Sequence, residues 1–117
     1  SWLIAADDRT GALEVAGACA RDGAPVAVVA GISNHVRVPG VVDLATRHLS
    51  ASTAAERART VDRVDVASVH AHKIDSTLRG NWAAEIAARH GASGRPVLVV
   101  PALPALGRIC RDGTVLE

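Results

Sequence analysis

The first thirty residues, SWLIAADDRTGALEVAGACARDGAPVAVVA (residues 1–30), contain the pattern from which the fold follows. An apolar run at Trp2–Ala6 predicts a strand, and apolar residues at helical spacing predict a helix over Gly11–Asp22. Gly23 suits the end of that helix, and the unbroken apolar run Pro25–Ala30 suits a strand buried on both faces. Strand, helix and strand in this order predict a βαβ unit with a parallel sheet.

The same alternation continues to about residue 100. Further strands are predicted at three apolar runs, Val41–Ala45, Val64–Val69 and Pro96–Val100. Two more helices are predicted over 50–63 and 82–90, the second preceded by Asn81 as N-cap and ended by Gly91. Residues beyond Pro101 are predicted to be loop. The fold class is therefore α/β: one three-layer, Rossmann-like domain over residues 1–117, with a mostly parallel sheet of about five strands flanked by helices.

Composition excludes several classes of partner. The 13 basic and 12 acidic residues give a net charge of +1, which leaves no electrostatic footprint for nucleic acid or an anionic membrane. Trp2 and Trp82 are the only aromatic residues, so a platform for stacking bases is nearly excluded. We expect neither nucleic acid nor a membrane as partner, and the sequence leaves a homodimer open.

Cysteines and hydropathy indicate the compartment. Cys19 and Cys110 are far apart, with no C-x-x-C spacing, and suit two thiols in a reducing environment. No apolar run approaches the ~20 residues that span a bilayer, and no basic segment followed by an apolar one opens the chain. A cytoplasmic protein is expected. The chain opens on a strand and stops at Leu116–Glu117, so we also expect a fragment of a longer protein.

The stretch KIDSTLRGN (Lys73–Asn81) combines a cation, a carboxylate, two hydroxyls, an arginine and a glycine directly after an apolar run. Such groups are costly to desolvate, so a segment kept only for stability rarely contains so many of them. A ligand with a negative charge and several hydroxyls needs about this mixture, with Arg79 forking onto a carboxylate or phosphate. The segment is predicted to be a binding loop.

Four polar clusters follow the predicted strands at their carboxyl ends. They are Asp7–Gly11, Thr46–His48, Lys73–Asn81 and Pro101–Arg108. Ligands of open α/β sheets bind in the crevice outside these strand ends. The clusters therefore predict a ligand site along one edge of the sheet.

Adjacent carboxylates, Asp7 and Asp8, suit three roles: binding Mg²⁺, accepting hydrogen bonds from ligand hydroxyls, or deprotonating one of them. The alternative is that Asp8 or Thr10 only caps the following helix. We favour function for the pair, because two acids exceed what capping needs. No G-x-G-x-x-G or P-loop replaces them, so this turn is not predicted to hold a dinucleotide or triphosphate.

For each of the basic residues and histidines, a role without ligand binding is also possible. Arg47, Arg79 and Arg108 could each be solvated surface residues, but Arg79 stands in a polar run before a glycine, which favours binding. Lys73 either pairs with Asp75 or places a point charge beside an anionic group. His70 and His72 alternate and so share a face, without a third ligand nearby. We predict no metal site and no tightly bound cofactor in this chain.

Taken in order, these segments resemble the N-terminal domain of the four-carbon acid sugar kinases. The family's A-D-D-x-T-G-A, K-x-D-S-T-L-R-G-N and P-A-x-P-x-x-G-R motifs are similar to Ala6–Ala12, Lys73–Asn81 and Pro101–Arg108. The resemblance implies ATP-dependent phosphorylation of a hydroxyl on a small sugar acid, of the threonate, erythronate or oxo-tetronate type. It implies that this domain holds the acid sugar while a C-terminal domain, absent from this chain, binds the nucleotide. ATP and Mg²⁺ are thus expected for the full-length enzyme only.

On the positions that carry the resemblance we hypothesise a role for each residue of the site. Arg79, Lys73 and Arg108 would hold the substrate carboxylate, and Asp75, Ser76 and one of the Asp7–Asp8 pair would bind its hydroxyls. Asp8 would orient the attacking hydroxyl as the catalytic base. The full set of expected substrate-binding residues is Asp7, Asp8, Thr10, Arg47, Lys73, Asp75, Ser76, Arg79 and Arg108. The chain alone is expected to be inactive.

Two other classes of function are compatible with parts of the pattern. Receiver-type phosphoacceptor domains also carry an acidic pair after the first strand, and Asp43 could imitate their acceptor. However, Asp43 lies inside a predicted strand and Lys73 comes one strand too early for that class. The other alternative is a fragment that binds a small molecule and catalyses nothing.

Overall fold

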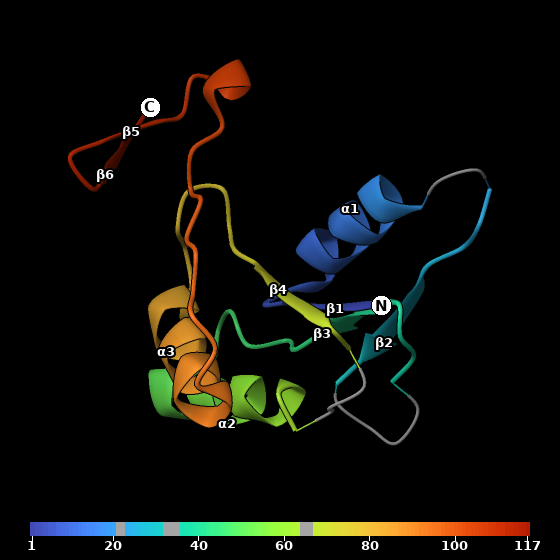
Figure 1. Cartoon of the computed structure of the whole chain (residues 1–117). Helices are drawn as coiled ribbons and strands as arrows, with labels where there is room; N and C mark the ends of the chain where they lie inside the picture. Colours follow the sequence, from blue (N-terminus) through green and yellow to red (C-terminus); the bar gives the residue numbers. More distant parts are fainter. Residues whose placement is uncertain (21–22, 32–35, 64–66) are drawn as a thin grey trace.

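The computed structural model describes residues 1–20, 23–31, 36–63 and 67–117, and it has an α/β architecture (Figure 1). Its elements in chain order are β1 (Trp2–Ala6), α1 (Arg9–Cys19), β2 (Ala27–Ala30), β3 (Gly40–Asp43), α2 (Ala51–Val61), β4 (Val69–Lys73), α3 (Trp82–Ser93), a 3₁₀ turn (Pro104–Leu106), β5 (Ile109–Arg111) and β6 (Thr114–Leu116). None of the helices among these residues is long and apolar enough to cross a membrane.

Within the described part of the chain, the main sheet has four parallel strands in the order β2-β3-β1-β4. Helix α1 covers one face of this sheet, and α2 and α3 lie together on the other face (Figure 1). The predicted α/β class with a parallel sheet and three layers is confirmed. Ala6 of β1 pairs with Asp43 of β3 and Lys73 of β4, so these strands end at the same edge.

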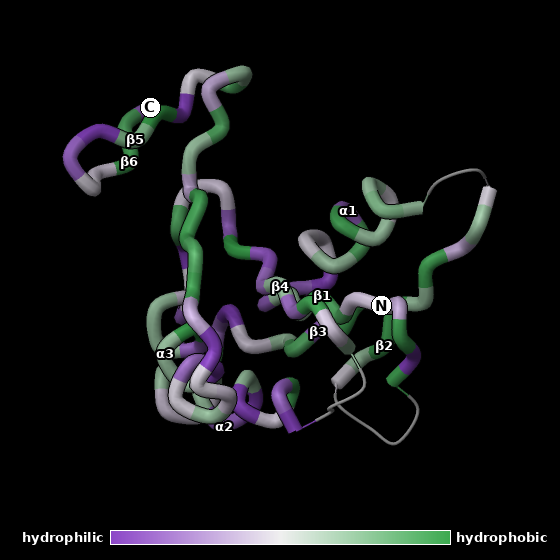
Figure 2. Tube along the Cα trace, viewed as in Figure 1, coloured by the Kyte–Doolittle hydropathy of each residue, from purple (hydrophilic) through white to green (hydrophobic). Residues whose placement is uncertain are grey.

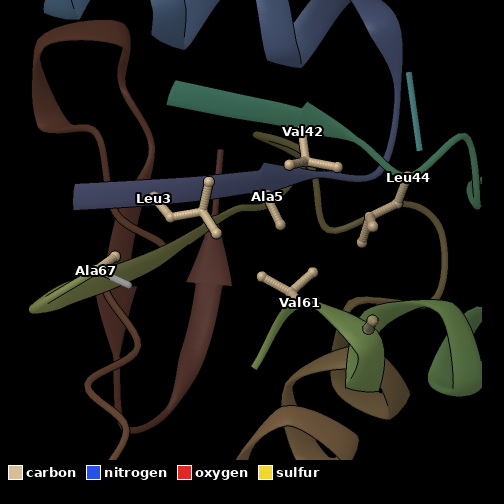
Figure 3. Close-up of a cluster of buried hydrophobic side chains, with 7 residues drawn as sticks. Leu3, Ala5, Val42, Leu44, Val61 and Ala67 are labelled. Carbon is tan, nitrogen blue, oxygen red and sulfur yellow. The ribbon is translucent and has the colours of Figure 1, made fainter. Parts of the chain in front are cut away.

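The core formed by the described residues consists of two clusters, one on each face of the sheet. Side chains alternate along β1, so Leu3 and Ala5 face Val61 of α2 (Figure 3), whereas Ile4 packs with alanines of α1 on the other face. Leu3 and Val61 are fully buried. Small residues let the helices approach the sheet closely, and this packing fixes the strand ends that carry the polar segments.

Helix starts follow from the capping residues. The Asp8 side chain accepts a hydrogen bond from the Gly11 amide at 2.8 Å and so begins α1, as the capping alternative predicted. Ser50 caps α2 in the same way through the Thr53 amide, at 3.3 Å. Asn81 stands at the N-cap of α3, but its side chain makes no capping bond. Its amide group is used at the site instead.

Some predicted boundaries are wrong. The fourth strand spans Val69–Lys73 and shares only Val69 with the predicted run, of which residues 64–66 lie outside the described part of the chain. Helix α3 continues through Gly91 and ends before Gly94, which has φ +67° and takes the left-handed C-cap position. Helix α1 ends at Cys19 instead of Asp22, and its C-cap residue Ala20 is already extended. Residues 21–22 lie outside the described part of the chain.

The C-terminal part differs most from expectation. Residues 96–100 are extended but pair with no strand of the described chain, and Leu98 is 87% exposed. Figure 2 shows this stretch as apolar, and it lines a cavity together with residues of α3. Residues 109–116, predicted to be loop, form a hairpin around Asp112 and Gly113, which both have positive φ. An Asp-Gly pair is typical of tight hairpin turns, so the loop prediction overlooked a local signal.

Candidate functional site

Three of the four polar clusters meet at the carboxyl edge of the sheet. They follow β1, β3 and β4, whose last residues are in register with one another. The predicted convergence is therefore confirmed for these three clusters. The fourth cluster, Pro101–Arg108, follows no strand and lies with the C-terminal hairpin.

Arg47 and Asp7 form the centre of the edge. The Arg47 Nε and Nη2 atoms donate to the two carboxylate oxygens of Asp7 at 3.0 and 3.1 Å, a bidentate fork. The backbone repeats the contact, because the amides of Thr46 and Arg47 donate to the Asp7 carbonyl at 2.8 and 3.2 Å. Asp7 is only 3% exposed, so this pair joins the ends of β1 and β3 out of water.

Arg47 also neutralises two further carboxylates. Its Nη1 lies 3.0 Å from Asp8 Oδ2, and its Nη2 lies 3.3 Å from Asp75 Oδ1. The hydrogen bond to Asp7 and the charges of the three aspartates raise the pKa of Arg47 above its ordinary value. One guanidinium thus holds three acidic side chains, which follow β1 and β4, in one cluster.

Asp75 organises the loop after β4. Its Oδ2 accepts from the amide and hydroxyl of Thr77, at 3.0 and 2.6 Å, and from Arg79 Nε at 2.9 Å. Arg79 Nη2 donates to Oδ1 at 2.8 Å. The fork with Arg79, followed by the Thr77 bonds, holds the pKa of Asp75 well below its usual range although burial opposes this. The Arg79 side chain is 66% exposed, so its remaining donors face solvent.

Replacing Asp75 by Asn is expected to flatten the response of stability to acid. The folded-state pKa of Asp75 is depressed, so its contribution is fully present above the unfolded value of about 3.9. That contribution is lost progressively as the pH falls below about 4 toward the folded pKa. Urea unfolding between about pH 5 and pH 2.5 should show a steeper loss in the wild type than in Asp75→Asn. If stability falls equally steeply with pH in the two proteins, Asp75 does not contribute this acid-sensitive stability.

The other expected site residues lie around this centre. Asp8 is 26% exposed and so is more accessible than Asp7. Lys73 Nζ donates to the Ile74 carbonyl at 2.8 Å and lies 3.6 Å from Glu14 Oε2, so the alternative pairing with Asp75 is wrong. Thr10 and Ser76 are exposed, Thr10 on the first turn of α1 and Ser76 in the loop after β4. Ser76 borders a cavity of about 500 Å³ that it shares with β6.

Arg108 is not brought into this cluster. Its Nε pairs with Glu117 Oε1 at 3.1 Å, next to the hairpin of β5 and β6. Figure 1 shows this hairpin set apart from the sheet and joined to α3 by an extended segment. Within the described residues, Arg108 makes no ion pair with Asp7, Asp8 or Asp75.

Gly80 allows the loop after β4 to pass over Asp7. Its φ of +82° is a left-handed conformation that residues with a side chain rarely adopt. A Cβ atom at Gly80 would stand 2.8 Å from Asp7 Oδ2 and 3.5 Å from Arg47 Cγ. The glycine before Asn81 is therefore a requirement of the site's packing.

Sequence reasoning missed a buried polar network beneath the site. Glu85 is fully buried, and its carboxylate accepts from the Thr46 hydroxyl and contacts His72 Nε2 at 2.8 Å. Arg89 of the same helix is 7% exposed and pairs with Asp62 Oδ2 at 2.9 Å. Acidic and basic residues on a helix ordinarily face solvent, so a single sequence carries no signal for this burial.

His70 and His72 share a face, as predicted, but they take part in this network. His70 Nδ1 lies 3.2 Å from Arg89 Nη2, and burial, followed by the nearby arginine charges, lowers the pKa of His70. Among the described residues, no three His, Cys, Asp or Glu side chains are placed to hold a metal ion. The two histidines also border a cavity of about 440 Å³ between β4, α3 and residues 95–100.

Comparison with known proteins identifies the family. Residues 2–116 match the family described as the sugar-binding N-terminal domain. The chain belongs to this family. This sugar-binding N-terminal domain is also 40% identical over 120 residues to a D-threonate kinase of Cupriavidus necator. The alignment covers 97% of the chain and 29% of that kinase, so the chain spans less than a third of its relative. The resemblance to the N-terminal domain of four-carbon acid sugar kinases is confirmed.

Proposed function

We propose that this chain is the acid-sugar-binding part of an ATP-dependent kinase that phosphorylates a hydroxyl of a four-carbon sugar acid. The observation that carries the proposal is exposed Arg79 paired with Asp75, which shares Arg47 with the Asp7–Asp8 pair at the carboxyl edge of a sugar-binding domain. The 40% identity to a D-threonate kinase supports a ligand of the threonate, erythronate or oxo-tetronate type. The chain alone is proposed to bind this acid and not to phosphorylate it.

The substrate carboxylate is assigned to Arg79, with Lys73 as a neighbouring charge. Arg79 contacts Asp75 through only two of its side-chain nitrogen atoms and is 66% exposed, so it retains donors for a ligand. The Lys73 side chain, 27% exposed, lies at the same edge, beside Gly11 and Glu14 of α1. We assign Arg108 no part in this cluster.

The substrate hydroxyls are assigned to Asp8, with Thr10 and Ser76 as exposed hydroxyl partners. Asp8 contacts Arg47 and the Gly11 amide, and its side chain stays open to solvent. It is proposed to orient the attacking hydroxyl, since phosphoryl transfer depends mainly on positioning and charge neutralisation. Asp7 and Asp75 are engaged by protein donors and are proposed to hold Arg47 and Arg79 in place.

ATP and Mg²⁺ are proposed to be held by a further domain of a longer protein. The sequence has no phosphate loop, and the described residues have no set of three metal-ligating side chains. We therefore derive no step through either group. A cytoplasmic location and a homodimer stay predictions.

The receiver-like alternative gains no support from the geometry. Asp43 is the last residue of β3, it is 6% exposed, and its carboxylate accepts from the Ala45 amide at 2.9 Å. A phosphoacceptor carboxylate has to be open to a phosphodonor. We therefore retain the sugar-acid proposal alone.

Titration calorimetry of this chain with D-threonate, erythronate and an oxo-tetronate tests the proposal. We expect saturable binding of at least one acid, and a loss of about tenfold or more in affinity for Arg79→Ala, since a hydrogen bond to a charged group is removed. Arg59→Ala is the matched control, because Arg59 is an arginine of α2 whose side chain is 40% exposed and pairs with Glu56. Binding that is absent, or equal in Arg79→Ala and Arg59→Ala, would contradict the proposal.

A further inference from the structure

Two side chains hold the turn that carries Arg47, one from helix α3 and one from the N-cap residue of that helix. Thr46 and Glu85 are both fully buried, and the Thr46 hydroxyl donates to Glu85 Oε1. One turn before Glu85, Asn81 Nδ2 donates to the carbonyls of Thr46 and Leu49, at 3.1 and 2.9 Å. The turn 46–49 is thus fastened to α3 from one side and to Asp7 from the other.

The second oxygen of Glu85 extends the network to the interior. His72 Nε2 lies 2.8 Å from Glu85 Oε2, and His72 Nδ1 lies 3.3 Å from Arg89 Nη1. A guanidinium only donates hydrogen bonds, so Nδ1 of His72 accepts and its Nε2 carries the proton. Arg89 is itself fixed by Asp62 and by the Ala71 carbonyl, at 2.9 and 2.8 Å. Thr46 and His72 therefore both donate to the carboxylate of Glu85.

We propose that Glu85 is a positioning residue of the substrate site, which fixes the Thr46 turn so that Arg47 stays on Asp7. This inference rests on the proposed function, because Arg47 holds in place the aspartates beside which the sugar acid is proposed to bind. A fully buried carboxylate is expensive to desolvate, and an apolar residue would fill the same space for stability alone. Glu85 differs from such a residue in that it accepts from Thr46 and His72 at once.

Replacing Glu85 by Gln separates positioning from packing, since the two side chains have almost the same shape. Gln has one acceptor oxygen and one donor NH₂ group. If the oxygen accepts from Thr46, the NH₂ faces the protonated Nε2 of His72, and two donors meet. His72 must then change tautomer, which turns Nδ1–H toward Arg89, or the Gln side chain turns over, so that its oxygen accepts from His72 and its NH₂ donates to the Thr46 hydroxyl. In both arrangements a neutral amide replaces the charged carboxylate as the partner of Thr46, and this weaker hydrogen bond loosens the Arg47 turn.

Nitrogen-15 NMR of the ligand-free chain gives the first readout. In the wild type we expect His72 in the neutral tautomer protonated at Nε2, and an Arg47 Nε–H that exchanges slowly with solvent. In Glu85→Gln we expect a changed His72 tautomer, or a turned-over Gln amide whose NH₂ donates to Thr46, and an Arg47 Nε–H exchange at least about tenfold faster. Glu56→Gln is the matched control, because Glu56 is an α2 glutamate whose side chain is 65% exposed.

Calorimetry with D-threonate gives the second readout, with a loss of about tenfold or more in affinity expected for Glu85→Gln and none for Glu56→Gln. If Glu85→Gln does not fold, Thr46→Val removes the same hydroxyl with little change of shape and should also speed Arg47 exchange. Arg47 exchange that stays at the wild-type rate in the folded variant overturns the proposal, even where stability falls. Failure of the wild type to bind any four-carbon acid would overturn the proposed function instead, and the NMR readout would still decide the role of Glu85.

Discussion

Replacing Arg47 by Met is expected to destabilise the domain by about 3–5 kcal/mol, the usual effect of removing one partner of a buried ion pair. Asp7 and Asp75 are 3% and 6% exposed, and both would lose their contact with this guanidinium. Asp8 stands within the same cluster, so three carboxylates would repel one another without the central cation. Urea unfolding at pH 7 measures the loss directly.

Arg59→Met is the matched control for this effect. Arg59 pairs with Glu56 on the surface of α2, and its side chain is 40% exposed. Exposed pairs of this kind contribute between about 0 and 1 kcal/mol. A loss for Arg47→Met no larger than that of Arg59→Met would mean that Arg47 does not hold the aspartates together.

Replacing Gly80 by Ala is expected to destabilise the domain by at least about 2 kcal/mol, because two penalties coincide. The φ of +82° is strained for alanine, and the new Cβ would stand 2.8 Å from Asp7 Oδ2. Asp7 cannot move aside without breaking its fork with Arg47. The free energy of unfolding in urea is the measurement, and affinity for D-threonate should fall with it.

Two other glycines separate the two penalties. Gly107 has a similar φ of +75°, but a Cβ there would meet no atom within 4 Å, so Gly107→Ala should cost only about 1–2 kcal/mol. Gly17 lies within α1, also with open space, and Gly17→Ala should stabilise the helix by about 0.5–1 kcal/mol. A loss for Gly80→Ala no larger than for Gly107→Ala would show that Asp7 yields freely.

The meeting of the polar clusters at one edge of the sheet could be predicted, because each cluster directly follows its strand in the sequence. Asp7 and Asp8 directly follow an apolar strand, and KIDSTLRGN follows another, so placing both at one edge required only the rule for parallel strands. The contacts within the edge could not be predicted in the same way. Arg47 pairs with Asp7, 40 positions away in the sequence, and Thr46 pairs with Glu85, 39 positions away. The hydrophobic periodicity of a sequence carries no information about such long-range pairs.

The misplaced fourth strand has a physical reason. Apolar content favoured 64–69, whereas β4 is an edge strand of the described sheet whose residues His70 and His72 face a buried polar network. A strand that contributes imidazoles to charged partners does not show the apolar pattern of a core strand. The same network explains why Glu85 and Arg89 were not predicted to be buried.

The wrong helix end has a different reason. Gly91 and Gly94 are both plausible stop signals in the sequence, and only the backbone distinguishes them. Gly94 adopts φ +67° and its amide donates to the His90 carbonyl at 2.8 Å, whereas Gly91 continues the helix. Stop signals of equal strength within one turn are resolved by the packing of the helix and not by composition.

Chemical-shift mapping with D-threonate decides whether the acid binds at the carboxyl edge of the sheet. The nitrogen-15-labelled chain is titrated with the acid, and the shifted backbone amides are assigned. We predict that the largest shifts fall on residues 7–11 and 73–80, with the Arg79 Nε–H among them. Shifts confined to the cavity between β4 and α3, or none in a folded sample at saturating acid, would contradict a sugar-acid site at this edge.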